Sequence, residues 1–328
     1  MKVGKIGINQ IDMKKSILFL ASVMLFATGC YEDYVKDFDT TAVYVAYQYD
    51  LRTFVLDEGE QFRFTVALGG VLKNDRDRKV SLVMAPSLID GALESMKQTD
   101  KVSGEYVVEA FSGSDIEALT ELPGSYYTID GMDGLTIRKN WHTASVTIKA
   151  TEQMKDDPKA FGPYYALAFK VAGADADVVI PEKNYAVVAV KCENRFYGTW
   201  SHSCKIVEKS SGAVVDTRYI PYATTDANAY TLTTVDGNTL ICDKVAGETR
   251  EMTLDFNGND FDITSSDGVS GTGYFNGSKL LQDRKLIMQY SYSNDSGNTV
   301  EVTDTLYFRN RYRDGVNEWQ DENPENYK

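Results

Sequence analysis

The stretch 229-AYTLTTVDGNTLICD-243 indicates the fold of this chain most directly. Apolar Tyr230 and Leu232 alternate with threonines, Asp236-Gly237 follows, and the alternation resumes at Leu240 and Cys242. Alternation with a period of two is typical of a strand with one buried face, and an Asp-Gly pair between two such runs is typical of a tight hairpin turn. The stretch therefore predicts a β-hairpin within an antiparallel sheet.

The same rhythm of alternating segments and tight turns extends over residues 194–312. Turn sequences recur about every ten to twelve residues, as in all-β domains; they include Ser210-Ser211-Gly212, Asn257-Gly258 and 294-NDSGN-298. A meander of roughly eight strands removes its exposed edges by closing on itself. We expect an up-and-down β-barrel over residues 194–312, followed by a polar tail over 313–328 that extends loosely from it.

Residues 41–193 also read as strands, but with longer connections between them. Alternation is clear from Phe62 to Leu68 and from Tyr165 to Val171, and 185-YAVVAV-190 is apolar enough for a strand buried on both faces. This spacing favours a β-sandwich over alternating β/α units. One short helix is expected over residues 115–119, with Ser114 as its cap. The whole chain is therefore predicted to be all-β.

The first thirty residues resemble the signal peptide of a bacterial lipoprotein. Met13-Lys14-Lys15 is followed by the apolar run 16-SILFLASVMLFA-27, which is short for a permanent transmembrane helix. Ala27-Thr28-Gly29-Cys30 resembles a lipobox, although Leu is usual where Ala27 stands. The resemblance implies that residues 1–29 are removed and that Cys30 is acylated, for example with palmitate. A plain secretory signal with a chance cysteine is the alternative.

Residues 30–40 form an acidic tether without a strand pattern. Its Glu32-Asp33 pair, directly behind Cys30, resembles the surface-export signal of Bacteroidetes lipoproteins. The resemblance implies a lipid-anchored protein of the outer membrane that faces the cell surface. An ordinary acidic tether is the alternative.

Several short motifs together resemble one family of Bacteroidetes surface lipoproteins. They are Leu68-Gly69-Gly70, Leu122-Pro123 with Tyr126-Tyr127, Leu135-Thr136-Ile137, Val146-Thr147-Ile148-Lys149 and 194-NRFYGTW-200. The resemblance implies an immunoglobulin-like N-terminal β-sandwich of unknown function over residues 41–193 and a calycin-like C-terminal barrel over residues 194–312. It also implies a place beside outer-membrane glycan importers. It supplies no catalytic residues.

Gly198-Thr199-Trp200 additionally resembles the G-x-W motif on the first strand of lipocalins. In that family the Trp plugs one end of the barrel and an Arg from the last strand lies across it, as a cation–π contact. The resemblance makes Trp200 the plug, with Arg309 or Arg311 as its partner. An ordinary buried tryptophan is the alternative, and a lipocalin-like ligand does not follow from the fold.

Composition argues against several classes of function. The chain has 34 Lys and Arg against 48 Asp and Glu, a net charge of −14, which disfavours nucleic acid as a partner. Its two histidines, His142 and His202, cannot build a multi-histidine metal centre, and both are expected at or near the surface. Neither a CxxC nor a G-x-S-x-G motif occurs. We therefore expect no enzyme, no cofactor and no metal.

Three cysteines follow the tether, namely Cys192, Cys204 and Cys242. Cys204 and Cys242 lie in the same predicted barrel. A disulfide between them and two free buried thiols are both compatible with the sequence.

Aromatic residues at predicted loop positions are the best indication of function. Sugars present C–H faces that stack on aromatic rings, while neighbouring polar groups bind their hydroxyls. The candidates for glycan stacking are Tyr126, Tyr127, Trp141, Tyr219 and Tyr222, with core packing as the alternative for each. The sequence thus favours a surface lipoprotein that binds or presents a polysaccharide or oligosaccharide for an outer-membrane importer, without catalysis. The alternative is a structural or interaction subunit of an outer-membrane assembly.

Overall fold

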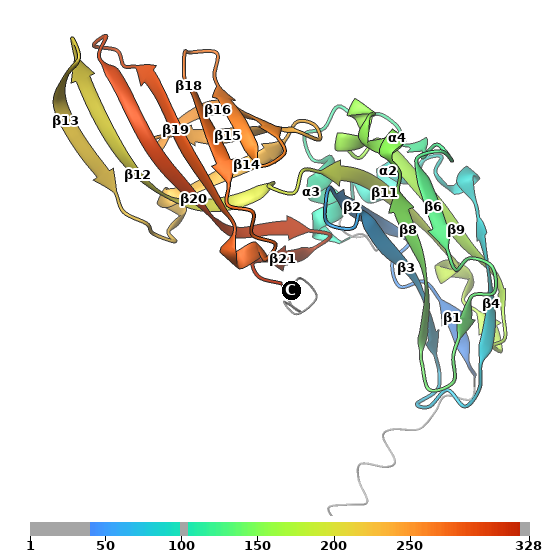
Figure 1. Cartoon of the computed structure of the whole chain (residues 1–328). Coiled ribbons are helices and arrows are strands. Elements are labelled where there is room, and N and C mark those ends of the chain that lie inside the picture. Colours follow the sequence, from blue (N-terminus) through green and yellow to red (C-terminus); the bar gives the residue numbers. More distant parts are fainter. Residues whose placement is uncertain (1–39, 99–103, 322–328) are drawn as a thin grey trace, which may run out of the picture.

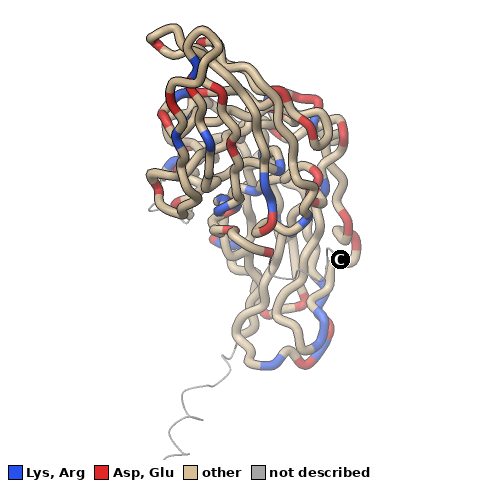
Figure 2. The backbone as a smooth tube through the Cα atoms, turned by 60° about the vertical axis from the view of Figure 1, so that its left-hand side comes forward, with Lys and Arg blue, Asp and Glu red and all other residues tan. Residues whose placement is uncertain are grey.

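The computed structural model describes residues 40–98 and 104–321. Cys30, the signal peptide and the tether up to residue 39 lie outside the described residues, and so does the lipid anchor predicted there. The described chain is all-β and forms an arch, with a β-sandwich on one side and a closed barrel on the other (Figure 1). Lys and Arg positions are interspersed with Asp and Glu positions along the backbone of both parts (Figure 2). In the described ranges, every helix is too short or too polar to cross a membrane.

The sandwich consists of two sheets. The first runs, in spatial order, β10 (Val178–Val179), β1 (Ala42–Tyr44), β3 (Gln61–Gly69), β8 (Thr143–Ala150) and β6 (Tyr127–Asp130). The second runs β2 (Tyr49–Val55), β11 (Tyr185–Glu193), β9 (Tyr165–Ala174), β4 (Arg78–Met84) and β7 (Thr136–Ile137), and β5 (Thr120–Glu121) pairs with β9. Strands β2 and β11 are parallel along seven residue pairs, from Tyr49↔Val187 to Val55↔Glu193.

The sandwich core follows from the predicted alternation. On β3 the even-numbered side chains from Phe62 to Leu68 are buried and the odd-numbered ones are exposed or half-buried. Phe64 stacks on Phe169 of the facing sheet, with ring centroids 4.3 Å apart. β11 is buried on both faces because α2 (Ala92–Met96) and α3 (Glu105–Phe111) cover the outside of the second sheet.

The position predicted for the short helix is wrong. Residues 115–119 contain no helix, whereas α3 ends just before them, at Phe111. The Ser114 hydroxyl donates backward to the Phe111 carbonyl at 3.0 Å, so it satisfies the end of a helix instead of starting one. The other short helices of the sandwich are η1 (Pro86–Leu88), α4 (Glu152–Lys155), η2 (Pro158–Phe161) and η3 (Pro181–Lys183).

The barrel confirms the predicted meander. Its strands are β12 (Gly198–Ser210), β14 (Ala229–Thr234), β15 (Thr239–Val245), β16 (Glu248–Asn257), β17 (Asp260–Thr264), β18 (Ser270–Phe275), β19 (Lys285–Ser293) and β20 (Thr299–Arg313). Each is antiparallel to its neighbours, and β20 returns to β12 over Thr199–Lys209, which closes the ring of eight. β13 (Ala213–Ile220) is a hairpin partner of β12 outside this ring. Two short helices, η4 (Asp226–Asn228) and η5 (Leu281–Asp283), lie between strands.

Gly273 shows why β18 needs a glycine. Its pairing with Phe261 and Met288 turns it toward the barrel core. A Cβ atom on Gly273 would overlap the Phe261 ring. Because glycine has no side chain, the Phe261 ring can pack against the backbone of β18 in the core.

The C-terminal segment corrects a second expectation. β20 continues to Arg313, the chain turns at Asp314-Gly315, and β21 (Val316–Glu318) pairs back onto it. Asp321 then accepts a hydrogen bond from the Leu281 backbone N–H at 2.8 Å. A loose tail is therefore wrong for residues 313–321, while residues 322–328 lie outside the described chain.

Candidate functional site

The end of the barrel next to the sandwich contains the residues predicted to plug it. Trp200 is fully buried, donates from Nε1 to the Phe196 carbonyl at 3.0 Å and packs edge-on against Phe308. The Arg311 guanidinium is buried and lies over the Tyr197 ring, 5.3 Å from its centroid. Arg309 instead points outward and pairs with Asp226 at 2.8 Å. Arg311 is thus the buried one of the two arginines, and its aromatic partner is Tyr197.

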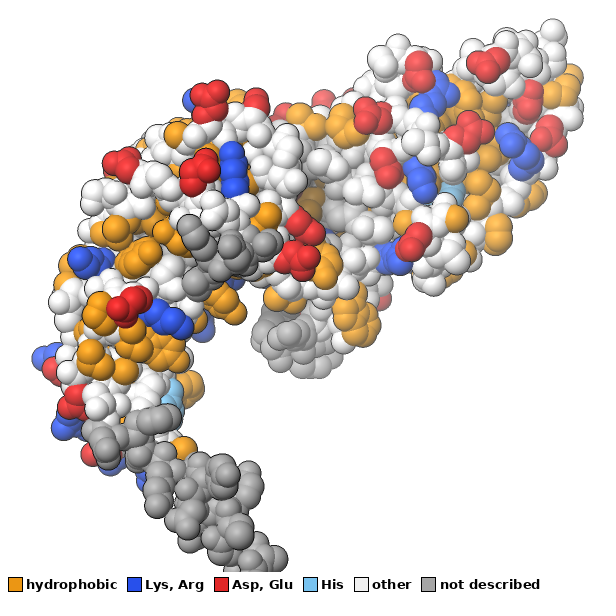
Figure 3. Space-filling model, turned by 180° about the vertical axis from the view of Figure 1, so that it is seen from behind, with side chains coloured by type: hydrophobic (Ala, Val, Ile, Leu, Met, Phe, Trp, Pro, Cys, Tyr) orange, Lys and Arg blue, Asp and Glu red, His pale blue; other side chains and the backbone are white. Residues whose placement is uncertain are grey.

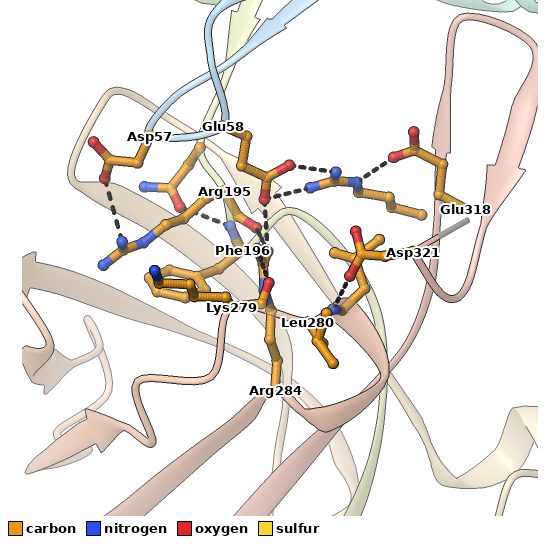
Figure 4. A network of polar contacts seen from close by, with 12 residues as sticks. Asp57, Glu58, Arg195, Phe196, Lys279, Leu280, Arg284, Glu318 and Asp321 are labelled. Atoms are coloured by element: carbon orange, nitrogen blue, oxygen red, sulfur yellow. Dashed lines mark hydrogen bonds and ion pairs between the residues drawn. The ribbon is translucent and has the colours of Figure 1, made fainter. Parts of the chain in front are cut away.

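Arg311 also takes part in the junction between the barrel and the sandwich (Figure 4). Glu58, in the turn after β2, binds Arg311 Nη2 at 2.6 Å and Arg284 Nη1 at 2.7 Å. Arg311 Nε donates to Glu318 at 2.7 Å. Burial raises the pKa of Glu58, but the hydrogen bonds and charges of the two arginines outweigh burial and hold this pKa below its usual value.

A second contact lies beside this cluster. Asp57 pairs with Arg195 at 3.4 Å, and the Arg195 guanidinium lies over the Phe196 ring at 4.6 Å. The turn of the sandwich is therefore held on the barrel by two neighbouring acids. These contacts join the barrel to the turn after β2 of the sandwich.

Two of the five candidate aromatics lie on the outer wall of the barrel. Tyr219 on β13 is 68% exposed and Tyr222 is 53% exposed. The Tyr222 ring packs edge-on against Tyr307 of β20, with centroids 4.9 Å apart. Lys205 lies over Tyr219 and Lys285 lies over Tyr307. We name this surface, formed by Tyr219, Tyr222, Tyr307, Lys205 and Lys285, the outer tyrosine face.

The other three candidate aromatics lie on the sandwich. Trp141 is 65% exposed and precedes β8, and its carbonyl accepts a hydrogen bond from Asn74 at 3.1 Å. Tyr126 and Tyr127 are half-buried against the sandwich core. The Tyr126 hydroxyl donates to Asp157 at 3.2 Å. The structure therefore places Tyr219 and Tyr222 on the outer wall of the barrel and leaves Trp141, Tyr126 and Tyr127 on the sandwich.

The barrel interior contains a polar cluster that the sequence analysis missed. His202, expected near the surface, is 1% exposed, and Asp304 is completely buried. His202 Nδ1 lies 3.3 and 3.4 Å from the two Asp304 oxygens. The hydroxyls of Tyr230 and Tyr290 donate to Asp304 Oδ2 at 3.1 and 3.4 Å. Cys204 completes a buried set of His, Cys and Asp ligands whose donor atoms all lie within 4.8 Å.

One signal in the sequence places these residues inside the barrel. His202 has the same parity along its strand as Trp200 and Cys204, all of which face the core. Burial raises the pKa of the Cys204 thiol to about 12, and burial together with Asp304 raises the pKa values of Tyr230 and Tyr290. Both tyrosines are therefore protonated at neutral pH and act as donors. The three described cysteines are free thiols.

At the end of the barrel away from Trp200, the barrel opens into a trough of about 560 Å3. Arg250 lies over the Tyr292 ring at 4.6 Å and pairs with Asp267. The other lining residues are Arg218, Glu248, Ser293, Asn294, Asp295, Ser296 and Val300. The trough combines an aromatic ring with both charge signs and amide groups, and its chemistry suits a polar ligand such as a sugar.

A further groove of about 480 Å3 lies on the outer wall over β16 to β19. Tyr274, which is 51% exposed, stands there beside Asp255, Asp260 and Asp262. In Figure 3 the barrel surface carries both charge signs beside exposed hydrophobic side chains. The barrel thus offers three surfaces that combine rings and polar groups: the outer tyrosine face, the trough and this groove.

Comparisons with known proteins support the fold. A family model for an N-terminal domain matches residues 38–178. No curated protein matches the chain. A structural-genomics protein of unknown function from Bacteroides ovatus is similar in fold, with a TM-score of 0.59 and 20% identity over 87% of this chain and 99% of that one. A multidomain protein including DUF1735, also from Bacteroides ovatus, aligns with a TM-score of 0.40 and 10% identity over 85% and 99%. The fold similarity to the first of these two proteins supports the architecture described above.

Proposed function

We propose that this protein is a lipid-anchored, non-catalytic outer-membrane protein that faces the cell surface and binds or presents glycan for an importer. The outer tyrosine face is the observation that carries the proposal. Two strongly exposed rings, Tyr219 and Tyr222, share one wall of the barrel with Tyr307. Rings of this kind stack on sugar C–H faces, and the adjacent lysines and tyrosine hydroxyls bind sugar hydroxyls.

The position of this face supports a role in binding. Residue 40, where the tether joins, contacts Gly70 at the far end of the sandwich. The barrel follows at the other end (Figure 1). With Cys30 acylated, the sandwich acts as a spacer that carries the barrel away from the membrane, where a long glycan can reach it.

The polar cluster inside the barrel supports binding without catalysis. A histidine beside an aspartate is a common catalytic pair. His202 and Asp304 are 1% and 0% exposed, however, and a polymer bound to the outer wall does not reach them.

Affinity electrophoresis of the chain from residue 31 on, against a panel of polysaccharides, tests the proposal. We expect one polysaccharide to retard the wild type, and Tyr222→Ala to weaken binding about five- to hundredfold, as for loss of about 1–3 kcal/mol at an aromatic anchor. Tyr219→Ala should act in the same direction. Trp141→Ala is the matched control, since its ring is equally exposed but lies on the sandwich. Equal binding by folded Tyr219→Ala and Tyr222→Ala variants would show that this face is not the site.

A second function is favoured by the edge of β13. Val214 and Val215 are 59% and 56% exposed there, and the strand is paired with β12 on one side. An exposed apolar edge is a surface to which another protein can add a strand. If every polysaccharide leaves the wild type unretarded, the chain is an interaction subunit, and Val215→Lys should release it from its outer-membrane assembly.

A further inference from the structure

We propose that His202, Cys204 and Asp304 form a binding site for a divalent cation of the zinc class inside the barrel. These residues supply imidazole nitrogen, thiolate sulfur and carboxylate oxygen, the three donor types that zinc takes from proteins. Their donor atoms lie within 4.8 Å of one another, and all three side chains are buried. The site is separate from the outer tyrosine face and does not depend on glycan binding.

The strand register brings the three donors to one place. Cys204 of β12 lies directly opposite Asp304 of β20, and His202 follows two residues away on the same face of β12. β12 is the first strand of the ring and β20 is the last, so these residues meet only because the barrel closes. The donors thus sit on two adjacent strands that are paired with each other along their length, which is a favourable scaffold for a metal site.

The spacing between the imidazole and the carboxylate suits a shared ion. His202 Nδ1 lies at nearly equal distances, 3.3 and 3.4 Å, from both oxygens of Asp304. A charge-assisted hydrogen bond would be shorter, at about 2.7–2.9 Å. Donor atoms that surround one tetrahedral ion at about 2.0–2.3 Å are roughly 3.3–3.7 Å apart. The two groups are therefore separated as ligands of a common ion are, and a small movement of the Cys204 sulfur completes the set.

Charge balance favours a divalent ion in this interior. The Asp304 carboxylate and the Cys204 thiolate carry two negative charges, which one divalent cation neutralises. On binding, the sulfur exchanges its proton for the metal, and one proton is released to water. His202 binds through Nδ1 and keeps its proton on Nε2.

A second layer of hydrogen bonds holds the carboxylate in place. The hydroxyls of Tyr230 and Tyr290 donate to Asp304, and each accepts a backbone N–H, from Gly247 at 2.8 Å and from Ala246 at 2.9 Å. The tip of the β15–β16 hairpin therefore fixes both tyrosines. Outer partners of this kind orient metal ligands and raise affinity. The same network orders the hairpin tip against the cluster.

Metal loading of the chain from residue 31 on, kept reduced, tests the site. After incubation with Zn2+ and gel filtration, we expect one zinc per chain by elemental analysis. With Co2+ the wild type should show a thiolate-to-cobalt charge-transfer band in the near ultraviolet. Cys204→Ser should lose this band and bind zinc at least about tenfold more weakly. Cys192→Ser is the matched control, because Cys192 is an equally buried thiol in the sandwich, and it should behave as the wild type.

Wild-type protein that retains no stoichiometric zinc and shows no cobalt–thiolate band would overturn the proposal. Loss of the band in Cys192→Ser but not in Cys204→Ser would overturn it as well. Should Cys204→Ser fail to fold, His202→Gln serves as the second variant. The wild-type measurement decides the outcome in either case, with a Zn2+-dependent rise in melting temperature as the supporting result.

Discussion

The sandwich and the barrel bury very different interiors. Between the sandwich sheets the core is apolar, with Phe64 stacked on Phe169 and aliphatic side chains around them. The barrel has an apolar base around Trp200, but above it a carboxylate and a histidine are fully buried. An apolar core tolerates substitutions that conserve its volume, whereas a buried polar group that loses its partner destabilises the fold. We therefore expect the loss of one polar partner inside the barrel to cost more stability than the loss of one at the edge of the sandwich.

The largest expected effect concerns the junction between the two parts. Glu58→Ala removes the carboxylate that pairs with buried Arg284 and Arg311, and we expect a loss of about 3 kcal/mol in the free energy of unfolding. Denaturant unfolding measures this. Glu152→Ala, which removes an exposed partner of Lys155, should cost less than about 0.5 kcal/mol. Equal unfolding midpoints for the two variants would mean that the sandwich and the barrel are stable independently of this junction.

A second prediction compares the two interiors directly. Tyr230→Phe deletes one donor to buried Asp304 and leaves the Gly247 N–H without its acceptor, so it should cost about 2 kcal/mol. Tyr126→Phe deletes a hydroxyl that binds Asp157 at the edge of the sandwich. We expect a clearly smaller loss there, because water replaces the lost partner. Thermal unfolding of both variants gives the comparison, and a smaller loss for Tyr230→Phe would contradict the contrast between the interiors.

The smallest effect depends on pH and concerns Asp314, in the turn before β21. Burial raises the pKa of Asp314 to about 6, although Arg52 and Thr53 oppose the shift. A carboxyl whose pKa is higher in the folded state than its usual value of 3.8 stabilises the fold below about pH 4, and this stabilisation is lost as the pH rises through 6. Asp314→Asn removes the dependence and keeps a residue that tolerates the positive φ of 53°. We expect the variant to become more stable relative to the wild type as the pH rises from 4 to 7, and denaturant unfolding at several pH values measures this.

Asp267 is a control of opposite sign for this pH series. Hydrogen bonds from Arg250 and Ser265 lower its pKa to about 2. Its contribution is present above about pH 4 and is lost as the pH falls toward 2, so Asp267→Asn should weaken the protein at neutral pH. If the two variants shift the unfolding midpoint in the same direction with pH, the assignment of Asp314 is wrong.

The local sequence predicts the strands well because the side-chain period of a strand is a local property. Tyr230 to Cys242 forms the hairpin that its alternation indicates, and the Asn257-Gly258 turn lies where expected. The helix predicted after Ser114 is wrong because a serine hydroxyl can satisfy either end of a helix.

The polar cluster was harder to predict. His202 and Asp304 meet only through the register that closes the barrel, and no local pattern encodes that register. Their parity on the strands was readable, however, and it places both side chains inside. The outer tyrosine face was half predictable: the exposure of Tyr219 and Tyr222 follows from their positions, but their common wall with Tyr307 needs the folded barrel.

The parallel pairing of β2 and β11 has a mechanical consequence. Both strands point at the barrel: β11 continues into it as the covalent link, and β2 ends in the turn that carries Glu58. A pull on the barrel is therefore shared between a peptide chain and an ion-paired turn, side by side. Because the two strands lie along the direction of pull, their ladder is loaded in shear, and its hydrogen bonds must yield together and not one after another. A force applied to the barrel therefore passes along both strands into the sandwich.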